Sequence, residues 1–279
     1  MRLFYILSIC ILWVFSAFAE KPADADIQTA ITEKSKYIQK LSSFKDIKET
    51  DNWFIFGYIA TLTQKGIGPK NIYVYVPKGE DGLSGMKVRL HGFLPFPFPS
   101  VTYNQFRHFM NDSSALDELT AHLGKEAAAG FKQRFINSIQ LDFLTDEGYV
   151  SFFKKEQALF EDFLQQYADK LEQIKQWNDT LLKAAKGNLK QSPPDSLLED
   201  AGFAAYKNKI DLLGMDFVLP GVTGSTCTQC FMMVSGFTPS DNYSGFFWIK
   251  DENLLPPWDP NGVFFQQSLG GGWYIFHST

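Results

Sequence analysis

Residues 151–186 read SFFKKEQALFEDFLQQYADKLEQIKQWNDTLLKAAK, a stretch without glycine or proline that decides the fold. Apolar residues recur in it at alternating spacings of four and three, which places an apolar stripe along one face of a helix. The stripe consists of Phe160, Leu164, Tyr167, Leu171, Ile174, Asn178, Leu181 and Ala185. At about 1.5 Å per residue the stretch would extend roughly 54 Å, which is long for a compact domain. We therefore predict a long helix that packs against the helices before it as a hairpin.

Weaker helical patterns flank this stretch on both sides. Apolar residues recur at helical spacing, with interruptions, across residues 103–140. On the other side, Ser192 followed by Pro193 and Pro194 is typical of a helix N-terminus and predicts a shorter helix over residues 197–213. We assign residues 103–213 to one helical insertion.

Strand patterns occupy the segments on either side of the helical insertion. In residues 51–102, aromatic and β-branched runs cover residues 53–63, 72–76 and 86–91, with turn signals between them. In residues 214–279, shorter runs of the same kind recur up to the chain end. This order predicts an α+β protein, with one antiparallel β domain formed from the N- and C-terminal segments around an inserted long helical hairpin. Two separate β layers flanking a bundle are the alternative.

The first residues, MRLFYILSICILWVFSAFA, have the organisation of a signal peptide. Arg2 precedes an apolar run, and Ala17-Phe18-Ala19 is a small-x-small cleavage site. The apolar run is shorter than the about 20 residues that a membrane-spanning helix needs. We therefore expect residues 1–19 to be removed and the chain to be exported to the periplasm or outside the cell, with no stable transmembrane span after cleavage. Residues 20–50 form a polar segment with a helix expected over residues 26–40.

The composition and motifs exclude several classes of partner. Acidic residues outnumber basic ones by 31 to 26, and the formal net charge is −5. Nucleic acid binding needs a basic surplus to neutralise phosphates, so we expect no nucleic acid partner. The sequence contains no phosphate-binding loop, dinucleotide fingerprint or calcium loop, and we expect neither a cofactor nor a metal.

Cys227 and Cys230, in the stretch STCTQCFMM at residues 225–233, are the only cysteines after the signal peptide. Four interpretations are open: a structural disulfide, a thiol-exchange pair, a cysteine nucleophile and half of a zinc site. Export to an oxidising compartment favours the disulfide. Thiol exchange needs a helix after the pair, but Gly236 and Pro239 follow closely. A zinc site would need two further ligands, and the four histidines show no close pairing.

The nucleophile interpretation would make the protein an enzyme. Over five residues, the run Cys-Thr-Gln-Cys-Phe at 227–231 resembles the run around a papain-like nucleophile. This resemblance implies an exported cysteine-dependent hydrolase of peptidase or amidase type, with Cys230 as nucleophile and His91 or His277 as its base. We keep it as the alternative to the leading hypothesis, and whether the protein is an enzyme stays open.

Aromatic residues make up 16% of the chain and carry the leading hypothesis. Several lie on or beside predicted strands, where they could bind a ligand by stacking on sugars or contacting an apolar partner. These candidate ligand-binding residues are Trp53, Tyr58, Tyr73, Tyr75, Trp248, Trp258 and Trp273. The competing interpretation is that they fill the core. The leading hypothesis is an exported, non-enzymatic binding or envelope-associated protein that contacts a protein, a cell-envelope component or a carbohydrate through this aromatic-rich β surface or through the helical hairpin.

Overall fold

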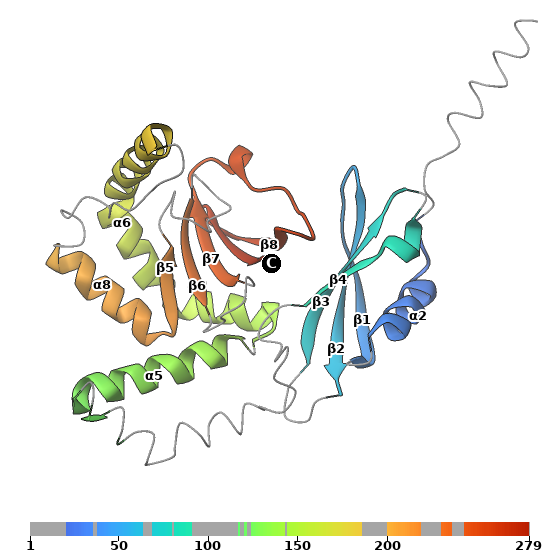
Figure 1. Ribbon diagram of the computed structural model, residues 1–279, viewed down its shortest axis with the longest axis horizontal. Coiled ribbons are helices and arrows are strands. Elements are labelled where there is room, and N and C mark those ends of the chain that lie inside the picture. Colours follow the sequence, from blue (N-terminus) through green and yellow to red (C-terminus); the bar gives the residue numbers. More distant parts are fainter. Residues whose placement is uncertain are drawn as a thin grey trace, which may run out of the picture. The chain divides into compact units, whose positions relative to one another are not determined.

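The computed structural model describes residues 21–35, 38–63, 69–79, 81–90, 117, 120–121, 124–142, 144–185, 200–218, 230–235 and 243–278. The chain divides into two compact units, Met1–Thr63 with Ile72–Arg89 and Gln64–Asn71 with Leu90–Thr279. Helices and antiparallel sheets are both present (Figure 1), so the predicted α+β class is confirmed.

The first unit is a helix followed by an antiparallel meander. α2 (Asp24–Lys34) precedes β1 (Ile38–Glu49), β2 (Trp53–Leu62), β3 (Lys70–Pro77) and β4 (Lys87–Leu90), with a short 3-10 helix, η1 (Gly82–Gly85), before the last strand. The strands lie in the order β1-β2-β3-β4. α2 buries Ile27 and Ile31, and the Tyr58 hydroxyl donates to Asp24 Oδ1 at 2.8 Å, which joins the helix to β2.

β1 corrects the expectation for residues 20–50. The sequence predicted a helix over residues 26–40, but α2 ends at Lys34 and a strand follows from Ile38. The register between β1 and β2 shifts repeatedly along the strand. Because each shift breaks the two-residue alternation of polar and apolar side chains, the strand is hidden in the sequence.

The second unit packs helices on a five-stranded antiparallel sheet. α5 (Lys125–Asp142), α6 (Asp146–Ala185) and α8 (Ala201–Leu212) precede β5 (Met215–Val218), β6 (Cys230–Ser235) and β7 (Tyr243–Ile249). A 3-10 helix, η2 (Glu252–Leu254), leads to the hairpin of β8 (Val263–Gly270) and β9 (Trp273–Ser278). The strand order is β5-β6-β7-β9-β8.

The predicted long helix is confirmed as α6, but its apolar stripe has a different partner from the one expected. Phe160 packs against Phe246 and Trp273 of the sheet, with ring centroids 5.8 and 5.7 Å apart. One turn further, Phe163 contacts the rings of α8. The described part of the stripe, up to Tyr167, therefore packs on the sheet and on α8, whereas the sequence predicted packing against the preceding helices. The aromatic face of a sheet gives such a stripe a wide apolar surface to bury against.

The strands of the two chain ends form two separate sheets. The sequence predicted a single β domain built from both ends, but the described strands pair only with strands of their own segment, as the two-layer alternative expects. Pairing strands joined by short connections costs less chain entropy than pairing strands from opposite ends of the chain.

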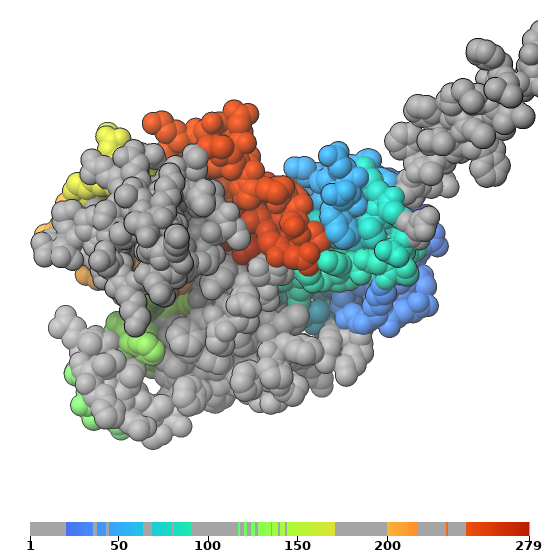
Figure 2. All heavy atoms as spheres, turned by 45° about the horizontal axis from the view of Figure 1, so that its top comes forward, coloured from blue at the N-terminus to red at the C-terminus, as the bar shows by residue number. Residues whose placement is uncertain are grey.

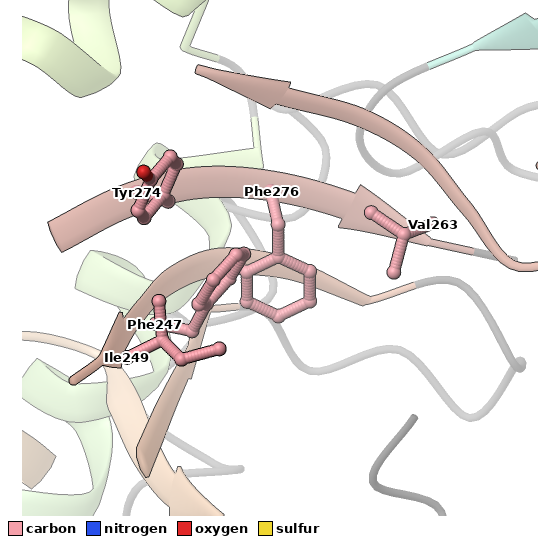
Figure 3. Packing of buried hydrophobic residues seen from close by; sticks show 5 residues of the cluster. All are labelled: Phe247, Ile249, Val263, Tyr274 and Phe276. Atoms are coloured by element: carbon pink, nitrogen blue, oxygen red, sulfur yellow. The ribbon is translucent and has the colours of Figure 1, made fainter. Parts of the chain in front are cut away.

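Both faces of the five-stranded sheet bury aromatic side chains. On one face, Phe247, Tyr274 and Phe276 pack with Ile249 and Val263 (Figure 3). The other face meets α6, as described above. Neighbouring residues of a strand point to opposite faces. β7 and β9 therefore place apolar side chains on both faces of the sheet. Their sequences are continuous apolar and aromatic runs, without the alternation of apolar and polar residues that a half-exposed strand has.

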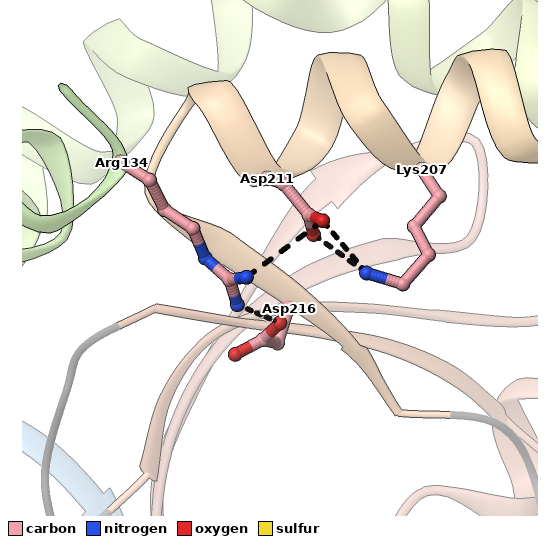
Figure 4. Close-up of polar contacts among 4 residues, drawn as sticks. All are labelled: Arg134, Lys207, Asp211 and Asp216. Atoms are coloured by element: carbon pink, nitrogen blue, oxygen red, sulfur yellow. Dashed lines mark hydrogen bonds and ion pairs between the residues drawn. The ribbon is translucent and has the colours of Figure 1, made fainter. Parts of the chain in front are cut away.

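An ion-pair network joins α5, α8 and β5 (Figure 4). Arg134 of α5 pairs with Asp216 of β5 and lies 3.7 Å from Asp211 of α8, which also pairs with Lys207 at 2.7 Å. Between α8 and β5 the chain turns at Gly214, whose φ is +84°, a conformation that favours glycine. These side chains are partly exposed, so we interpret the network as a modest contribution to packing.

Candidate functional site

A buried polar network joins β7, β9 and the start of α6. His277 Nδ1 lies 2.9 Å from Ser244 Oγ, and His277 Nε2 lies 3.1 Å from Asp146 Oδ1. All three residues are buried, His277 completely. Burial lowers the pKa of His277, which favours the neutral ring. The assignment that satisfies both contacts has Nε2–H donating a hydrogen bond to Asp146 and Nδ1 accepting one from the Ser244 hydroxyl.

Strand register and a helix end position these side chains. Ser244 and His277 are direct partners in the pairing of β7 with β9, so their side chains share one face of the sheet. Asp146 is the first residue of α6, where a carboxylate also interacts favourably with the helix dipole. The sequence carries no signal for this grouping, because the three residues lie on elements far apart in the chain.

Lys70 and Asn71, the first two residues of β3, belong to the second unit and extend the network. Asn71 Nδ2 donates to Asp146 Oδ2 at 2.8 Å, and Asn71 Oδ1 is buried without a hydrogen-bond partner in the described part of the chain. Lys70 Nζ donates to the carbonyl oxygen of Asp142 at the end of α5. Burial, partly offset by the charge of Lys70, raises the pKa of Asp142 to about 7. Burial also lowers the pKa of Lys70 to about 8.

The hydrogen bonds of Ser244, His277 and Asp146 have the roles found in a serine hydrolase triad, where a histidine accepts from a serine and donates to a carboxylate. The surroundings do not fit catalysis. The His277 ring is stacked on Phe265 at a centroid distance of 5.1 Å, and Tyr149 contacts it edge-on at 5.7 Å. Ser244 lies within a strand under α6 and is 7% exposed. A substrate has no room beside these groups, so we interpret the network as structural.

The predicted cysteine sites are only partly described. Cys227 and His91 lie outside the described residues, and for Cys230 the structure gives only the backbone, at the start of β6 opposite Ile249. His277 is paired with Ser244, and the β7 positions Ile249 and Ser244 are separated by roughly 17 Å at about 3.4 Å per residue. The sheet register therefore does not bring Cys230 and His277 together.

The predicted aromatic surface is mostly core. Tyr58, Tyr73, Tyr75 and Trp273 are at most 2% exposed, so they cannot stack on a ligand. The remaining three are half-buried and have intramolecular contacts. Trp53 packs edge-on against Tyr75, Trp248 Nε1 donates to the Gly271 carbonyl, and Trp258 contacts Phe265. Burial thus overrides the expectation of one outward-facing aromatic sheet, because large rings stabilise the fold most when they leave water.

A groove opens on the first unit, beside the start of α2 and the connection from β3 to η1. Its volume is about 320 Å³. The lining residues are Pro22, Phe54, Val76, Pro77, Gly79, Gly82 and Leu83. Phe54 and Val76 are buried beneath it, whereas Gly79 is exposed at its edge. This groove was not predicted from the sequence, although proline and glycine directly after a buried strand are a signal for an irregular surface there.

Lysines adjoin the residues that line the groove. Lys21 and Lys78 each form an ion pair with a carboxylate of β1. Lys34, in the last turn of α2, instead donates to the carbonyl oxygens of Leu83 and Ser84 at 3.3 and 2.7 Å. Within the described residues no carboxylate pairs with Lys34, so the groove edge at Leu83 carries a positive charge that is not neutralised.

Across the described residues, no helix is both long and apolar enough to span a membrane. In the same part of the chain, no three or more histidine, cysteine or acidic side chains are grouped closely enough to hold a metal ion.

Comparison with known proteins assigns no family, because no family model, curated protein or solved structure matches the chain. The function has to be inferred from the geometry of the chain itself.

Proposed function

We propose that this protein is an exported, non-enzymatic binding protein whose groove on the first unit receives an apolar side chain of a partner protein. The groove is the observation that carries the proposal. Its volume of about 320 Å³ is at the lower end of the range of ligand sites, and apolar residues form most of its lining. Apolar anchors inserted into such pockets supply much of the affinity of protein interfaces.

The charge at the groove edge defines the partner further. The ammonium group of Lys34 is exposed and contacts only carbonyl oxygens among the described residues, next to the lining residue Leu83. A carboxylate placed there would gain a charge-assisted hydrogen bond. The partner segment therefore presents an apolar side chain with an aspartate or glutamate beside it. This replaces the aromatic sheet surface of the leading hypothesis, whose rings are largely buried.

The sealed polar network supports a non-enzymatic role. Ser244 and His277 are the described groups arranged most like a catalytic pair, and both are buried between the sheet and α6. The cysteine hydrolase alternative lacks support from the register, which separates Cys230 from His277 along the sheet. Export and a disulfide between Cys227 and Cys230 stay part of the proposal, since they rest on the N-terminal sequence and on compartment chemistry.

Gly79 allows a sharp test of the groove. A Cβ atom at this position would meet no heavy atom within 4 Å, so Gly79→Phe adds a large ring to the groove lining without a steric clash at the backbone. Gly130 on α5 is equally open and provides the matched control, Gly130→Phe. A library of random heptapeptides is displayed on phage and selected on the immobilised protein, and the affinities of the selected peptides are measured by isothermal titration.

The proposal expects selected peptides that share an apolar residue next to an acidic one. Gly79→Phe should weaken their binding about tenfold or more, whereas Gly130→Phe should leave it unchanged. Lys34→Gln should weaken the binding of peptides that carry the aspartate or glutamate more than the binding of the same peptides with asparagine or glutamine in its place. Peptides that bind equally well to wild type and Gly79→Phe would place recognition elsewhere and overturn the proposal.

A further inference from the structure

We infer that the groove on the first unit receives Leu254 of a second copy of the chain, whose Asp251 pairs with Lys34 at the groove edge. This inference rests on the proposed function, because it names the partner of the same groove. The partner defined above presents an apolar side chain with a carboxylate beside it, and the chain itself carries such a pair on its surface.

Three large apolar side chains are exposed in the described part of the chain. They are Leu254 of η2 at 42%, Leu212 of α8 at 49% and Phe131 of α5 at 42%. Leu254 belongs to the connection between β7 and β8, within the part of the chain that lies at the surface in orange-red in Figure 2. The next residue, Leu255, packs against the buried cluster of the sheet, which holds the turn that presents Leu254.

Asp251 supplies the carboxylate beside Leu254. It is the N-cap of η2, and the Leu254 amide donates to its carbonyl oxygen at 3.0 Å. Residues three apart in a 3-10 helix lie on the same side, so the two side chains share one side of the turn. Asp251 Oδ1 accepts from the backbone and side-chain amides of Asn253 at 3.0 and 2.9 Å. Oδ2 has no partner among the described residues and is available to an ammonium group.

The charges near Leu254 complement the groove edge. Glu252 is exposed, accepts a hydrogen bond from the Tyr274 hydroxyl and adds a second negative charge, which Lys250 partly offsets. At the groove, Lys34 contacts only carbonyl oxygens among the described residues. A charge-assisted hydrogen bond from this ammonium group to Asp251 therefore satisfies both groups without breaking an existing ion pair.

The other two exposed apolar side chains lack an available carboxylate. Leu212 follows Asp211, but that carboxylate is already held in the ion-pair network of Figure 4. Phe131 is followed by Lys132, whose charge has the same sign as that of the groove edge. Leu254 is thus the exposed apolar side chain of the described residues that fits the groove in both shape class and charge.

The contact joins two different surfaces, so it is heterologous. Each copy offers one groove and one Leu254, and two copies can close reciprocally or successive copies can extend head to tail. One apolar anchor and one ion pair make a small interface, which places the affinity at the weak end of protein association. The groove is then filled when the protein is concentrated and open to other partners when it is dilute.

Sedimentation velocity up to high micromolar concentrations tests the inference. The expected result is reversible self-association whose dissociation constant rises about tenfold or more in Leu254→Gln and in Gly79→Phe. Leu212→Gln and Gly130→Phe make the same changes at other open positions and should leave it unchanged. A mixture of Leu254→Gln with Gly79→Phe should form a one-to-one complex, because one variant keeps the groove and the other keeps the leucine.

The ion pair has its own test. Asp251→Asn removes the charge but keeps Oδ1 and a favourable N-cap residue. It should weaken self-association about two- to fivefold, as expected for an exposed ion pair, and have no further effect in Lys34→Gln. Asp259→Asn is the matched control, because Asp259 Oδ1 likewise accepts from a backbone amide two residues further on, that of Asn261, at 2.7 Å.

A wild-type protein that stays monomeric at every concentration would overturn the inference. So would self-association that persists unchanged in both Leu254→Gln and Gly79→Phe. The peptide selection separates this failure from that of the proposed function. Peptides that bind wild type but not Gly79→Phe, with a protein that stays monomeric, keep the groove as a binding site and remove only the second copy as its partner.

Discussion

At the scale of single residues, burial determines what the polar side chains can do. Ser244, His277 and Asp146 follow the serine–histidine–carboxylate order of a catalytic triad with the two ring nitrogens exchanged, and they lie in a layer closed by α6 and by aromatic rings. Buried polar groups that satisfy one another help to specify a unique packing, and removing one member leaves the others with a desolvation cost.

Ser244→Ala should therefore lower the free energy of unfolding by about 1–3 kcal/mol, because the buried His277 Nδ1 loses its hydroxyl donor. Urea denaturation measures the difference. The control is Ser151→Ala on the exposed side of α6, which should stay within about 0.5 kcal/mol of wild type. A fluorophosphonate, which labels reactive active-site serines, should not label Ser244 in the folded protein. Labelling would show that substrate reaches the network.

The same network predicts a pH dependence. Burial raises the pKa of Asp142 from 3.8 to about 7 in the folded protein. The contribution of this carboxyl to stability is therefore fully present below about pH 4 and is lost as pH rises towards 7. The free energy of unfolding of wild type minus that of Asp142→Asn should therefore fall between about pH 4 and pH 7. Above about pH 7 this difference should change little. Urea denaturation at several pH values checks the prediction, and a constant difference between the two proteins would contradict it.

At the scale of elements, α6 organises the second unit. Its ring at Phe160 is completely buried between Phe246 and Trp273, where helix and sheet meet. The next turn contacts α8, whose N-terminus is capped by Asp200 through the amides of Gly202 and Phe203. One helix therefore joins the sheet to α8 through the aromatic side chains of its apolar face.

Phe160→Ala should cost about 3–5 kcal/mol, as expected for deleting a buried ring at a site that cannot collapse around the cavity. Thermal and urea unfolding measure the loss. Phe131→Ala on α5 removes a ring that is 42% exposed and should cost far less. Equal effects of the two substitutions would mean that α6 does not pack on the sheet as described.

At the scale of the whole molecule, the proposed disulfide depends on the proposed export, because an oxidising compartment favours disulfides. If residues 1–19 are removed on export, Cys227 and Cys230 are the only cysteines left in the chain. The denatured protein should then show no titratable thiol before reduction and both thiols after it, as measured with a thiol-reactive chromophore. Two free thiols in freshly exported protein would exclude the disulfide and revive a role for Cys230 in thiol chemistry.

Sequence reasoning succeeded where a pattern is local and regular. The stripe of residues 151–186 predicted α6, and the aromatic runs at residues 53–63 and 72–76 predicted β2 and β3. It failed where the pattern is interrupted, as in β1 with its register shifts. It failed also for the candidate sites, because residue type does not reveal burial: Tyr75 and Trp273 read as possible ligand contacts and are core residues.

The sequence by itself therefore determined the α+β class and the long helix, since helical and strand periodicity act over neighbouring residues. Tertiary structure decided which surfaces face water and which distant residues meet. It placed Ser244 against His277, packed the described part of the α6 stripe on a sheet and on α8, and left a groove beside Leu83. These outcomes depend on contacts between segments far apart in the chain, and periodicity along the sequence does not encode them.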